Sequence, residues 1–164
     1  MKRASAWLLL LVVLAWYWPV ALGARASSLS LDTHTLPLLD WFSDAIAKDP
    51  VPEWNSLDGT GTPAVAHSEI AAYYPPHQLA YRVLGTARAW SVLLVLHTLA
   101  AALFGRLLAR GFGLGRLSSL LVGIVFAGQG FFMTHADRGW AAATACWLPL
   151  AVWTAWKWLK DGSI

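Results

Sequence analysis

The residues best suited to chemistry begin just after a long apolar amino-terminal run. Asp32 is followed by Thr33 and His34, so the chain leaves its apolar stretch through a short polar patch. A carboxylate near a low-dielectric surface can act as a general base or hold a cation. A solvated loop aspartate would have the same sequence. Asp32 is therefore our candidate catalytic base, weighed against an ordinary surface role.

Further acids follow in the same polar stretch. His67 and Glu69 could form a pair, although surface loops contain many such pairs. Asp40 and Asp44 are four residues apart, a spacing that could chelate a metal but also marks the wet side of an amphipathic helix. Cys146 is the lone cysteine, which excludes a disulfide scaffold and any site built from several cysteines. We therefore predict no cofactor, and nothing in the sequence supports a divalent metal.

Basic residues flank the apolar segments. Arg82 and Arg88 lie where a predicted membrane helix reaches the outer face, and a lipid phosphate would give them a partner. Snorkelling toward lipid headgroups explains these positions almost as well. Arg138 lies with His135 and Asp137 in a short turn between two later apolar runs. His97 is inside an apolar run, where a polar group is a functional candidate or a hydrogen-bonding partner of a neighbouring helix.

The elements that must position these residues are four stretches without Asp, Glu, Lys or Arg. They are Ala4–Ala24, Ala89–Gly105, Leu117–Ala136 and Gly139–Trp156. A charged side chain at mid-bilayer costs about 2.5–3.5 kcal/mol, so such runs predict membrane helices. The composition agrees, with 57% apolar residues and a mean hydropathy of +0.52. The sequence predicts an all-α, multi-pass membrane protein with about four spans, which excludes a soluble enzyme.

The charge distribution predicts the orientation. With the amino terminus in the cytoplasm, the inner segments sum to about +6 and the outer segments to about −3, as the positive-inside rule expects. The net charge of +3 is thus explained without nucleic acid. Residues 1–24 resemble a secretory signal, but the apolar core of about 17 residues and the aromatic residues that follow it favour a retained helix.

The long polar loop, residues 25–88, separates the first span from a three-helix segment, residues 89–160, and a short end at 161–164. Thr35 and Pro37 can begin a helix whose apolar face would rest on the outer membrane surface. That face would consist of Leu38, Trp41, Phe42, Ala45 and Ile46. Turn residues at 58–63 and the Tyr74–Pro76 break divide the remaining loop. Later in the chain, Gly123 and Ala127 form a small-residue stripe, and Pro149 predicts a kink.

An ordered set of short motifs after the first span resembles the YfhO-type bacterial membrane proteins. In the loop and the second run it comprises Trp54-Asn55, Gly59, Gly61-Thr62-Pro63, Ala71-Ala72, Tyr74-Pro75-Pro76, Leu84-Gly85 and Leu96-His97. It continues through Arg110, Gly113-Leu114, Arg116, Gly123, Phe126-Ala127, Gly130-Phe131-Phe132, His135 and Trp147-Leu148-Pro149-Leu150. Asp32 followed by Pro37 matches the early acidic position of that family, whereas His34 and Leu36 stand near an expected Gln.

The resemblance implies a GT-C-like glycosyltransferase of the bacterial inner membrane, using a polyprenyl-phosphate sugar donor on the outer face. By that analogy Asp32 would deprotonate or position the acceptor hydroxyl, and Arg82, Arg88 or Arg138 would neutralise the departing lipid phosphate. The residues expected to line the cavity are His34, His67, Glu69, Tyr74, His97, His135 and Asp137.

The chain is much shorter than proteins of that family, so we expect an amino-terminal fragment that is not active alone. A small non-catalytic subunit that packs against a larger membrane transferase or transporter is the alternative. A transporter or channel ranks third, because only His97, Gln129 and Pro149 interrupt the apolar spans.

Overall fold

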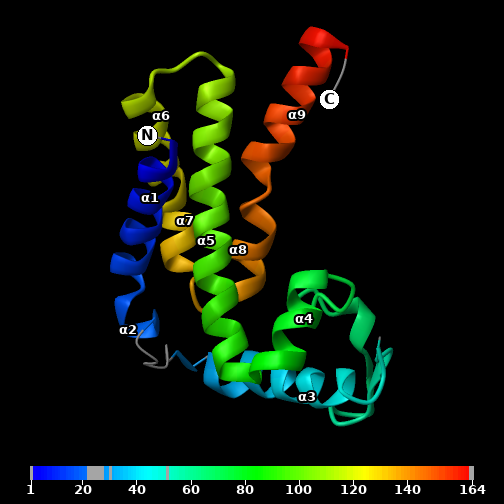
Figure 1. Cartoon of the computed structure of the whole chain (residues 1–164). Coiled ribbons are helices and arrows are strands. Elements are labelled where there is room, and N and C mark those ends of the chain that lie inside the picture. The colour runs from blue at the N-terminus through cyan, green and yellow to red at the C-terminus, as the bar shows by residue number, and fades with distance from the viewer. Residues whose placement is uncertain (1, 22–27, 30, 51, 163–164) are drawn as a thin grey trace. The chain divides into compact units, whose positions relative to one another are not determined.

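The computed structural model describes residues 2–21, 28–29, 31–50 and 52–162, and it is mostly helical, as predicted (Figure 1). The chain divides into two compact units. Unit 1 comprises Met1–Trp18, Val95–Ala136 and Ala141–Ile164. Unit 2 comprises Pro19–Leu94 and Asp137–Trp140. The predicted outer loop therefore forms a unit of its own, together with a four-residue segment from late in the chain.

Unit 1 is built from helices that coincide with the apolar runs. They are α1 (Lys2–Trp16), most of α5 (Thr86–Gly111), α6 (Arg116–Ala127), α7 (Gly130–Thr134), the end of α8 (Gly139–Ala145) and α9 (Leu148–Asp161). A short α2 (Trp18–Ala21) follows α1. Two helical stretches, Thr86–Gly111 and Arg116–Thr134, are long and apolar enough to cross a membrane, with mean hydropathies of 2.0 and 1.6.

The first and fourth runs do not form unbroken helices of that length in the described part of the chain. The apolar helix of the first run covers Ala6–Trp16. The fourth run is interrupted between α8 and α9, with Pro149 in the first turn of α9. Proline lacks an N–H and disfavours helical backbone at the residue before it, so an interruption here is physically expected. The sequence predicted a kink, and the structure has a break.

Small residues bring helices of unit 1 into close contact, as the Gly123 and Ala127 stripe predicts. A Cβ on Gly123 would clash with the backbone oxygen of Ala102 on α5 and lie 3.2 Å from Cβ of Arg106. Ala127 is fully buried. Because glycine at position 123 places no side chain between the helices, α5 and α6 approach closely there, the mode of packing that membrane helices favour.

Unit 2 contains η1 (Leu31–Thr35, a π-helical turn), α3 (Leu36–Ile46), the 3-10 turn η2 (Ala64–Ala66) and α4 (Pro75–Leu84). Its core is the apolar face of α3, on which Phe42 is fully buried. The ring of Phe42 meets Tyr81 of α4 edge to face, with centroids 6.0 Å apart. The predicted amphipathic helix is present as α3, and it packs against α4 (Figure 1). At this contact its apolar face buries protein surface.

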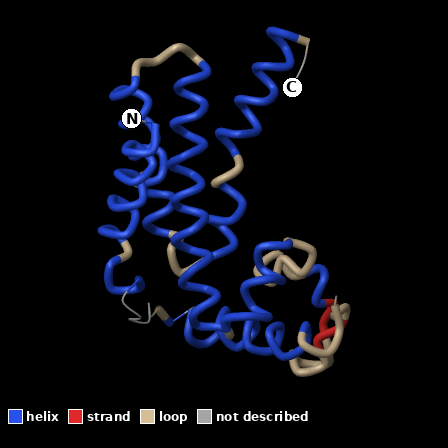
Figure 2. Tube along the Cα trace, viewed as in Figure 1, coloured by secondary structure: helices blue, strands red, loops and turns tan. Residues whose placement is uncertain are grey.

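A short hairpin and a glycine turn complete unit 2. Strand β1 (Trp54–Asn55) pairs antiparallel with β2 (Thr62–Pro63), so Trp54 lies opposite Pro63 (Figure 2). The turn residues between them were predicted, but the two strands were not. Gly85 has φ +68° and ψ 163°, a conformation that is essentially restricted to glycine, and it redirects the chain from α4 into α5.

Candidate functional site

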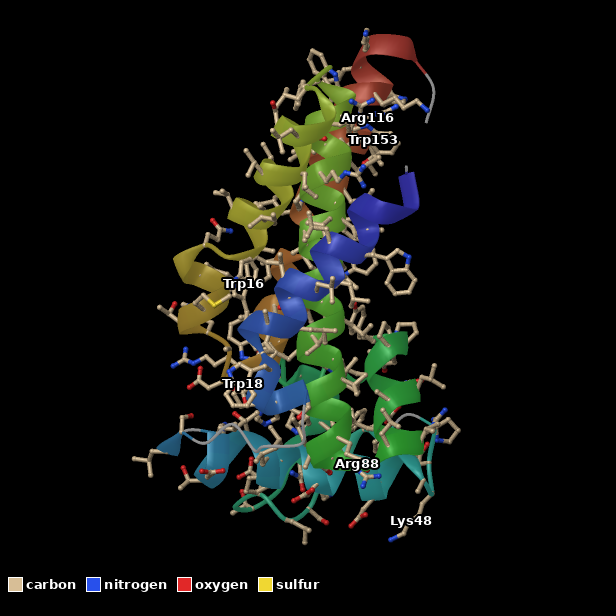
Figure 3. All side chains as sticks on the ribbon, turned by 60° about the vertical axis from the view of Figure 1, so that its left-hand side comes forward. Trp16, Trp18, Lys48, Arg88, Arg116 and Trp153 are labelled. Carbon is tan, nitrogen blue, oxygen red and sulfur yellow. The ribbon has the colours of Figure 1, made fainter. Side chains whose placement is uncertain are left out.

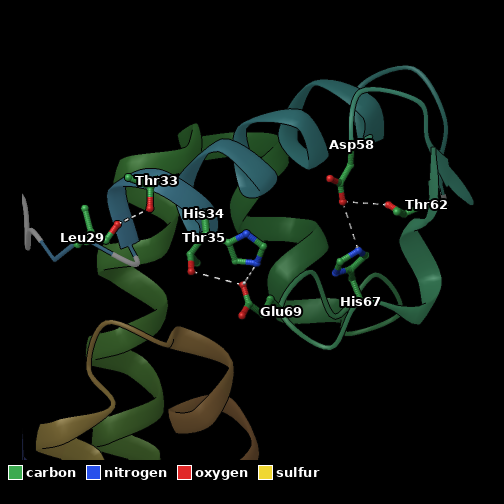
Figure 4. Close-up of polar contacts among 8 residues, drawn as sticks. All are labelled: Leu29, Thr33, His34, Thr35, Asp58, Thr62, His67 and Glu69. Carbon is green, nitrogen blue, oxygen red and sulfur yellow. Dashed lines mark hydrogen bonds and ion pairs between the residues drawn. The ribbon is translucent and has the colours of Figure 1, made fainter. Parts of the chain in front are cut away.

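The carboxylate of Glu69 is contacted by two neighbouring polar side chains of η1. Thr35 Oγ1 donates a hydrogen bond of 3.4 Å to Glu69 Oε2, and His34 Nε2 lies 3.7 Å from the same oxygen (Figure 4). Thr35 is buried, while His34 is largely exposed. Because η1 runs directly into α3, two consecutive residues of this turn reach one carboxylate from its buried and its wet side.

The backbone beside Glu69 is strained. Ala71 has φ +47°, and it is the non-glycine residue with positive φ in the part of the chain that the structure describes. Its N–H donates to the His67 carbonyl at 3.3 Å, and its own carbonyl accepts from the Tyr74 N–H at 2.8 Å. An alanine in this region costs energy, and such residues often occur where the chain must hold a functional group in place. The strain therefore singles out the 67–74 segment that carries Glu69.

Glu69 borders a small cavity inside unit 2. Its volume is about 10 Å³, enough for one water molecule or the tip of a hydroxyl group. The lining residues are Thr35, Leu39, Glu69, His77, Tyr81, Trp90, Leu93, Gly139 and Trp140. The cavity thus collects side chains from η1, α3, α4 and the start of α5, together with the 137–140 segment.

Trp90 contributes a hydrogen-bond donor to this cavity. Its ring is almost entirely buried, and its Nε1 has no hydrogen-bond partner among the described residues. Gly139 leaves room for it, because a Cβ there would lie 3.2 Å from Nε1. A buried donor without a partner costs free energy, so a ligand group that accepts from it would be stabilised.

Two aromatic or imidazole groups close the cavity on the α4 side. Burial raises the pKa of the Tyr81 phenol, so it is neutral at physiological pH. The His77 Nδ1–H donates to the Ile70 carbonyl at 3.1 Å. The cavity therefore places the Trp90 N–H and the Tyr81 O–H near the Glu69 carboxylate. The hydroxyl group of a ligand can accept a hydrogen bond from such a donor and donate one to the carboxylate.

Asp32 lies on the same η1 turn as Thr35, but its side chain does not line this cavity in the described part of the chain. Its N–H donates to the Ser28 carbonyl at 2.9 Å, and Ser28 Oγ donates to Asp137 Oδ2 at 3.1 Å. The structure thus brings Asp137 next to the chain segment that carries Asp32.

The three arginines are all exposed members of unit 2, and none lines the cavity. Arg82 Nη2 donates to the Pro50 carbonyl at 3.0 Å. Arg88 extends from the first turns of α5 (Figure 3), and Arg138 lies in the segment next to Asp137. They are available to anions at the surface but do not form one cluster around Glu69.

The remaining candidates divide between the units. His67 Nε2 lies 3.8 Å from Asp58 Oδ2 across the hairpin (Figure 4), and Tyr74 packs edge to face on His77 with centroids 5.2 Å apart. His97 is buried on α5 in unit 1. His135, also in unit 1, stacks on Phe131 at 4.7 Å and donates from Nδ1 to the Phe131 carbonyl at 3.0 Å. Unit 2 therefore holds every candidate except these two histidines.

Sequence reasoning missed several residues of the cavity. His77 and Tyr81 are four apart on α4, and this spacing could have indicated a shared buried face. Trp90 lay inside an apolar run and was counted only as membrane helix. Thr35 was predicted to cap α3, yet it makes no side-chain cap bond and donates to Glu69 instead.

No group of three His, Cys, Asp or Glu side chains suited to a metal ion occurs in the described ranges of the chain. The expectation of a cofactor-free site stays a prediction. No protein family, no curated protein and no solved structure matches this chain. The resemblance to YfhO-type proteins therefore rests on the ordered motifs alone.

Proposed function

We propose that this chain belongs to a bacterial inner-membrane glycosyltransferase-like protein, in which unit 2 binds the acceptor hydroxyl on the outer face. The observation that carries the proposal is the Glu69 carboxylate beside the unpartnered Trp90 N–H in one cavity. A hydroxyl that accepts from Trp90 and donates to Glu69 would satisfy both groups. The two long apolar helices support a membrane location.

The proposed reaction takes a sugar from a polyprenyl-phosphate donor. The acceptor oxygen forms a bond to the anomeric carbon, the bond from that carbon to the phosphate oxygen breaks, and the hydroxyl proton moves to a carboxylate. In this proposal Glu69 orients the hydroxyl in the cavity, and Asp32, which does not line the cavity, takes the proton by way of one water molecule. Arg82, Arg88 or Arg138 binds the lipid phosphate as it leaves, since guanidinium groups pair well with phosphate.

The test is sugar transfer in membranes that contain the full-length protein and a radiolabelled polyprenyl-phosphate sugar. We expect Asp32→Asn to lower the rate by about 100-fold or more, the usual loss when a general base is removed. Asp40→Asn is the matched control, because Asp40 lies on the exposed face of α3. An unchanged rate in Asp32→Asn would remove Asp32 from the mechanism, and unchanged rates in both Asp32→Asn and Glu69→Gln would remove the site.

The four-span topology with a cytoplasmic amino terminus is part of this proposal. A Thr60→Cys change in a Cys146→Ser background places one exposed thiol in the loop. In intact cells we expect a membrane-impermeant maleimide to label it. Labelling only after lysis would put unit 2 in the cytosol and would overturn the proposed active site.

A second candidate is a non-catalytic subunit that packs against a larger membrane protein. The observation that favours it is an exposed apolar stripe on α6, where Leu117, Leu121 and Val125 recur every fourth residue. Copurification of a partner with more spans, lost when Leu121 and Val125 are changed to Ser, would support this function. A stable monomer with transfer activity would contradict it.

A further inference from the structure

Unit 2 carries a second, larger hollow on its surface, separate from the cavity at Glu69. It is a groove of about 870 Å³ between the carboxyl end of α3 and the β1–β2 hairpin. Its lining residues are Trp41, Asp44, Ala45, Lys48, Asp49, Pro50, Pro52, Glu53, Trp54, Ser56 and Leu57. Two indoles and three carboxylates in one groove form a combination that the proposed sugar transfer does not use.

Trp54 is held in the groove by the hairpin. A Cβ on Gly61 would lie 2.5 Å from Trp54 Nε1, so the indole rests directly on the glycine backbone. Gly61 has φ +99°, and its N–H donates to the Asp58 carbonyl at 2.9 Å. Any other residue at position 61 would displace the ring. Even so, Trp54 remains 58% exposed. The fold therefore fixes a large apolar ring in position without burying it.

The charges around this ring are mainly negative. Asp44, Asp49 and Glu53 line the groove against one cation, Lys48, which leaves two net negative charges. Neither Asp44 nor Glu53 makes an ion pair or a side-chain hydrogen bond within the described residues. Arg82 adds a second positive charge at the edge, where its Nη2 donates to the Pro50 carbonyl, so the carboxylates of the groove outnumber the cations around it by one. Anionic ligands are thus repelled from a groove that attracts cations.

We propose that this groove binds an organic ammonium group, with Trp54 and Trp41 as the aromatic wall and Asp44 and Glu53 as the counter-charges. The electron-rich face of an indole attracts a cation electrostatically, and carboxylates nearby add to that attraction. Choline and ethanolamine headgroups of lipids and free amines share this chemistry. The inference is independent of the sugar-transfer proposal, because it involves neither Glu69 nor Asp32.

The experiment titrates choline into the full-length protein held in phosphatidylglycerol nanodiscs, which contain no ammonium group, at constant ionic strength. Binding is followed by saturation transfer to the choline methyl protons. We expect saturable binding whose Kd rises roughly tenfold in Trp54→Ala and severalfold in Asp44→Asn or Glu53→Gln. Trp18→Ala is the matched control, because Trp18 is 60% exposed but belongs to unit 1; its Kd stays unchanged.

The carboxylate variants keep the test valid if Trp54→Ala disturbs the hairpin, since both side chains are exposed. Absence of saturable choline binding by the wild type would overturn the proposal. So would glucose binding that depends on Trp54 but not on the carboxylates, because the groove would then hold a neutral sugar. Repeating the titration in discs that also contain phosphatidylcholine distinguishes a lipid headgroup from a soluble amine as the ligand. Displacement of choline by this lipid identifies a headgroup site, and retention of choline identifies a site for soluble amines.

Discussion

The two units of this chain are held together by different side chains. In unit 1, many buried helix positions are small, such as Ala101, Ala102 and Gly123, and they alternate with larger side chains such as Leu9 and Phe132. In unit 2 the buried positions are mostly large, such as Leu31, Phe42 and Ile70. Helices that are surrounded by lipid gain nothing hydrophobic from association, so close backbone contact is what stabilises their packing. A segment that folds in water gains most from burying large apolar groups.

The two units should therefore be vulnerable to opposite kinds of substitution. Removing volume should damage unit 2, and adding volume should damage unit 1. Hydrogen exchange measured by mass spectrometry can follow the amides of each unit separately in one sample.

The largest effect is expected from Phe42→Ala. The side chain is fully buried against Tyr81, so its truncation should destabilise unit 2 by about 3–5 kcal/mol. Exchange should accelerate in α3 and α4 while α6 keeps its protection. Equal acceleration in α6 would show that the units unfold together, and the comparison would fail.

Gly123→Ala should act on unit 1 with the opposite kind of change. The new methyl group would clash with the Ala102 carbonyl, and overpacking of this kind costs about 1–3 kcal/mol. Gly130→Ala is the control, because no atom lies within 4 Å of a Cβ at that position. Alanine there should be neutral or stabilising. Thermal melts in detergent that rank the two variants in the reverse order would refute close packing at Gly123.

Alkaline pH should loosen unit 2 through Tyr81. Its folded-state pKa lies above the ordinary value of 10.0, so the neutral phenol stabilises the fold and this contribution is complete below pH 10. Above that pH the unfolded phenol ionises first, and stability should fall by about 1.4 kcal/mol per pH unit until the folded-state pKa is reached. Tyr81→Phe should remove that slope, as checked by exchange of α4 amides between pH 9 and pH 11. A slope that persists in the variant would assign it to another group.

The smallest effects concern Glu69. Thr35→Val removes a buried hydrogen bond to its carboxylate and should cost about 1 kcal/mol. His34→Ala removes a partner of the same oxygen, but His34 is 60% exposed, so the cost should stay below about 0.5 kcal/mol. Chemical denaturation of the two variants side by side measures the difference. Equal costs would mean that burial does not distinguish the two contacts.

Elements with a local signal were predictable from the sequence. The apolar periodicity around Phe42 predicted α3, and the break at Tyr74–Pro76 marked where α4 begins. The Gly123 and Ala127 stripe predicted close packing. The break before α9 was underestimated, because the sequence marks where a proline disfavours helix but not how far the chain departs from it.

The candidate site was predicted only in part. Glu69 and Asp137 were identified as cavity residues, and Glu69 does border a cavity. Thr35, Tyr81 and Trp90 meet there from three separate elements, and such long-range meetings leave no local pattern in a single sequence. The sequence predicted the polar loop as a segment of its own, but not that the 137–140 segment joins it.

The turn at Gly85 has a consequence for handedness. A Cβ at this position would meet no atom within 4 Å, so there is room for a side chain. What disfavours an L-amino acid there is the backbone conformation, because its φ is positive. Chemical ligation could place D-alanine there, and the inverted stereocentre should suit the existing turn. L-alanine, identical in atoms, should disturb the passage from α4 into α5.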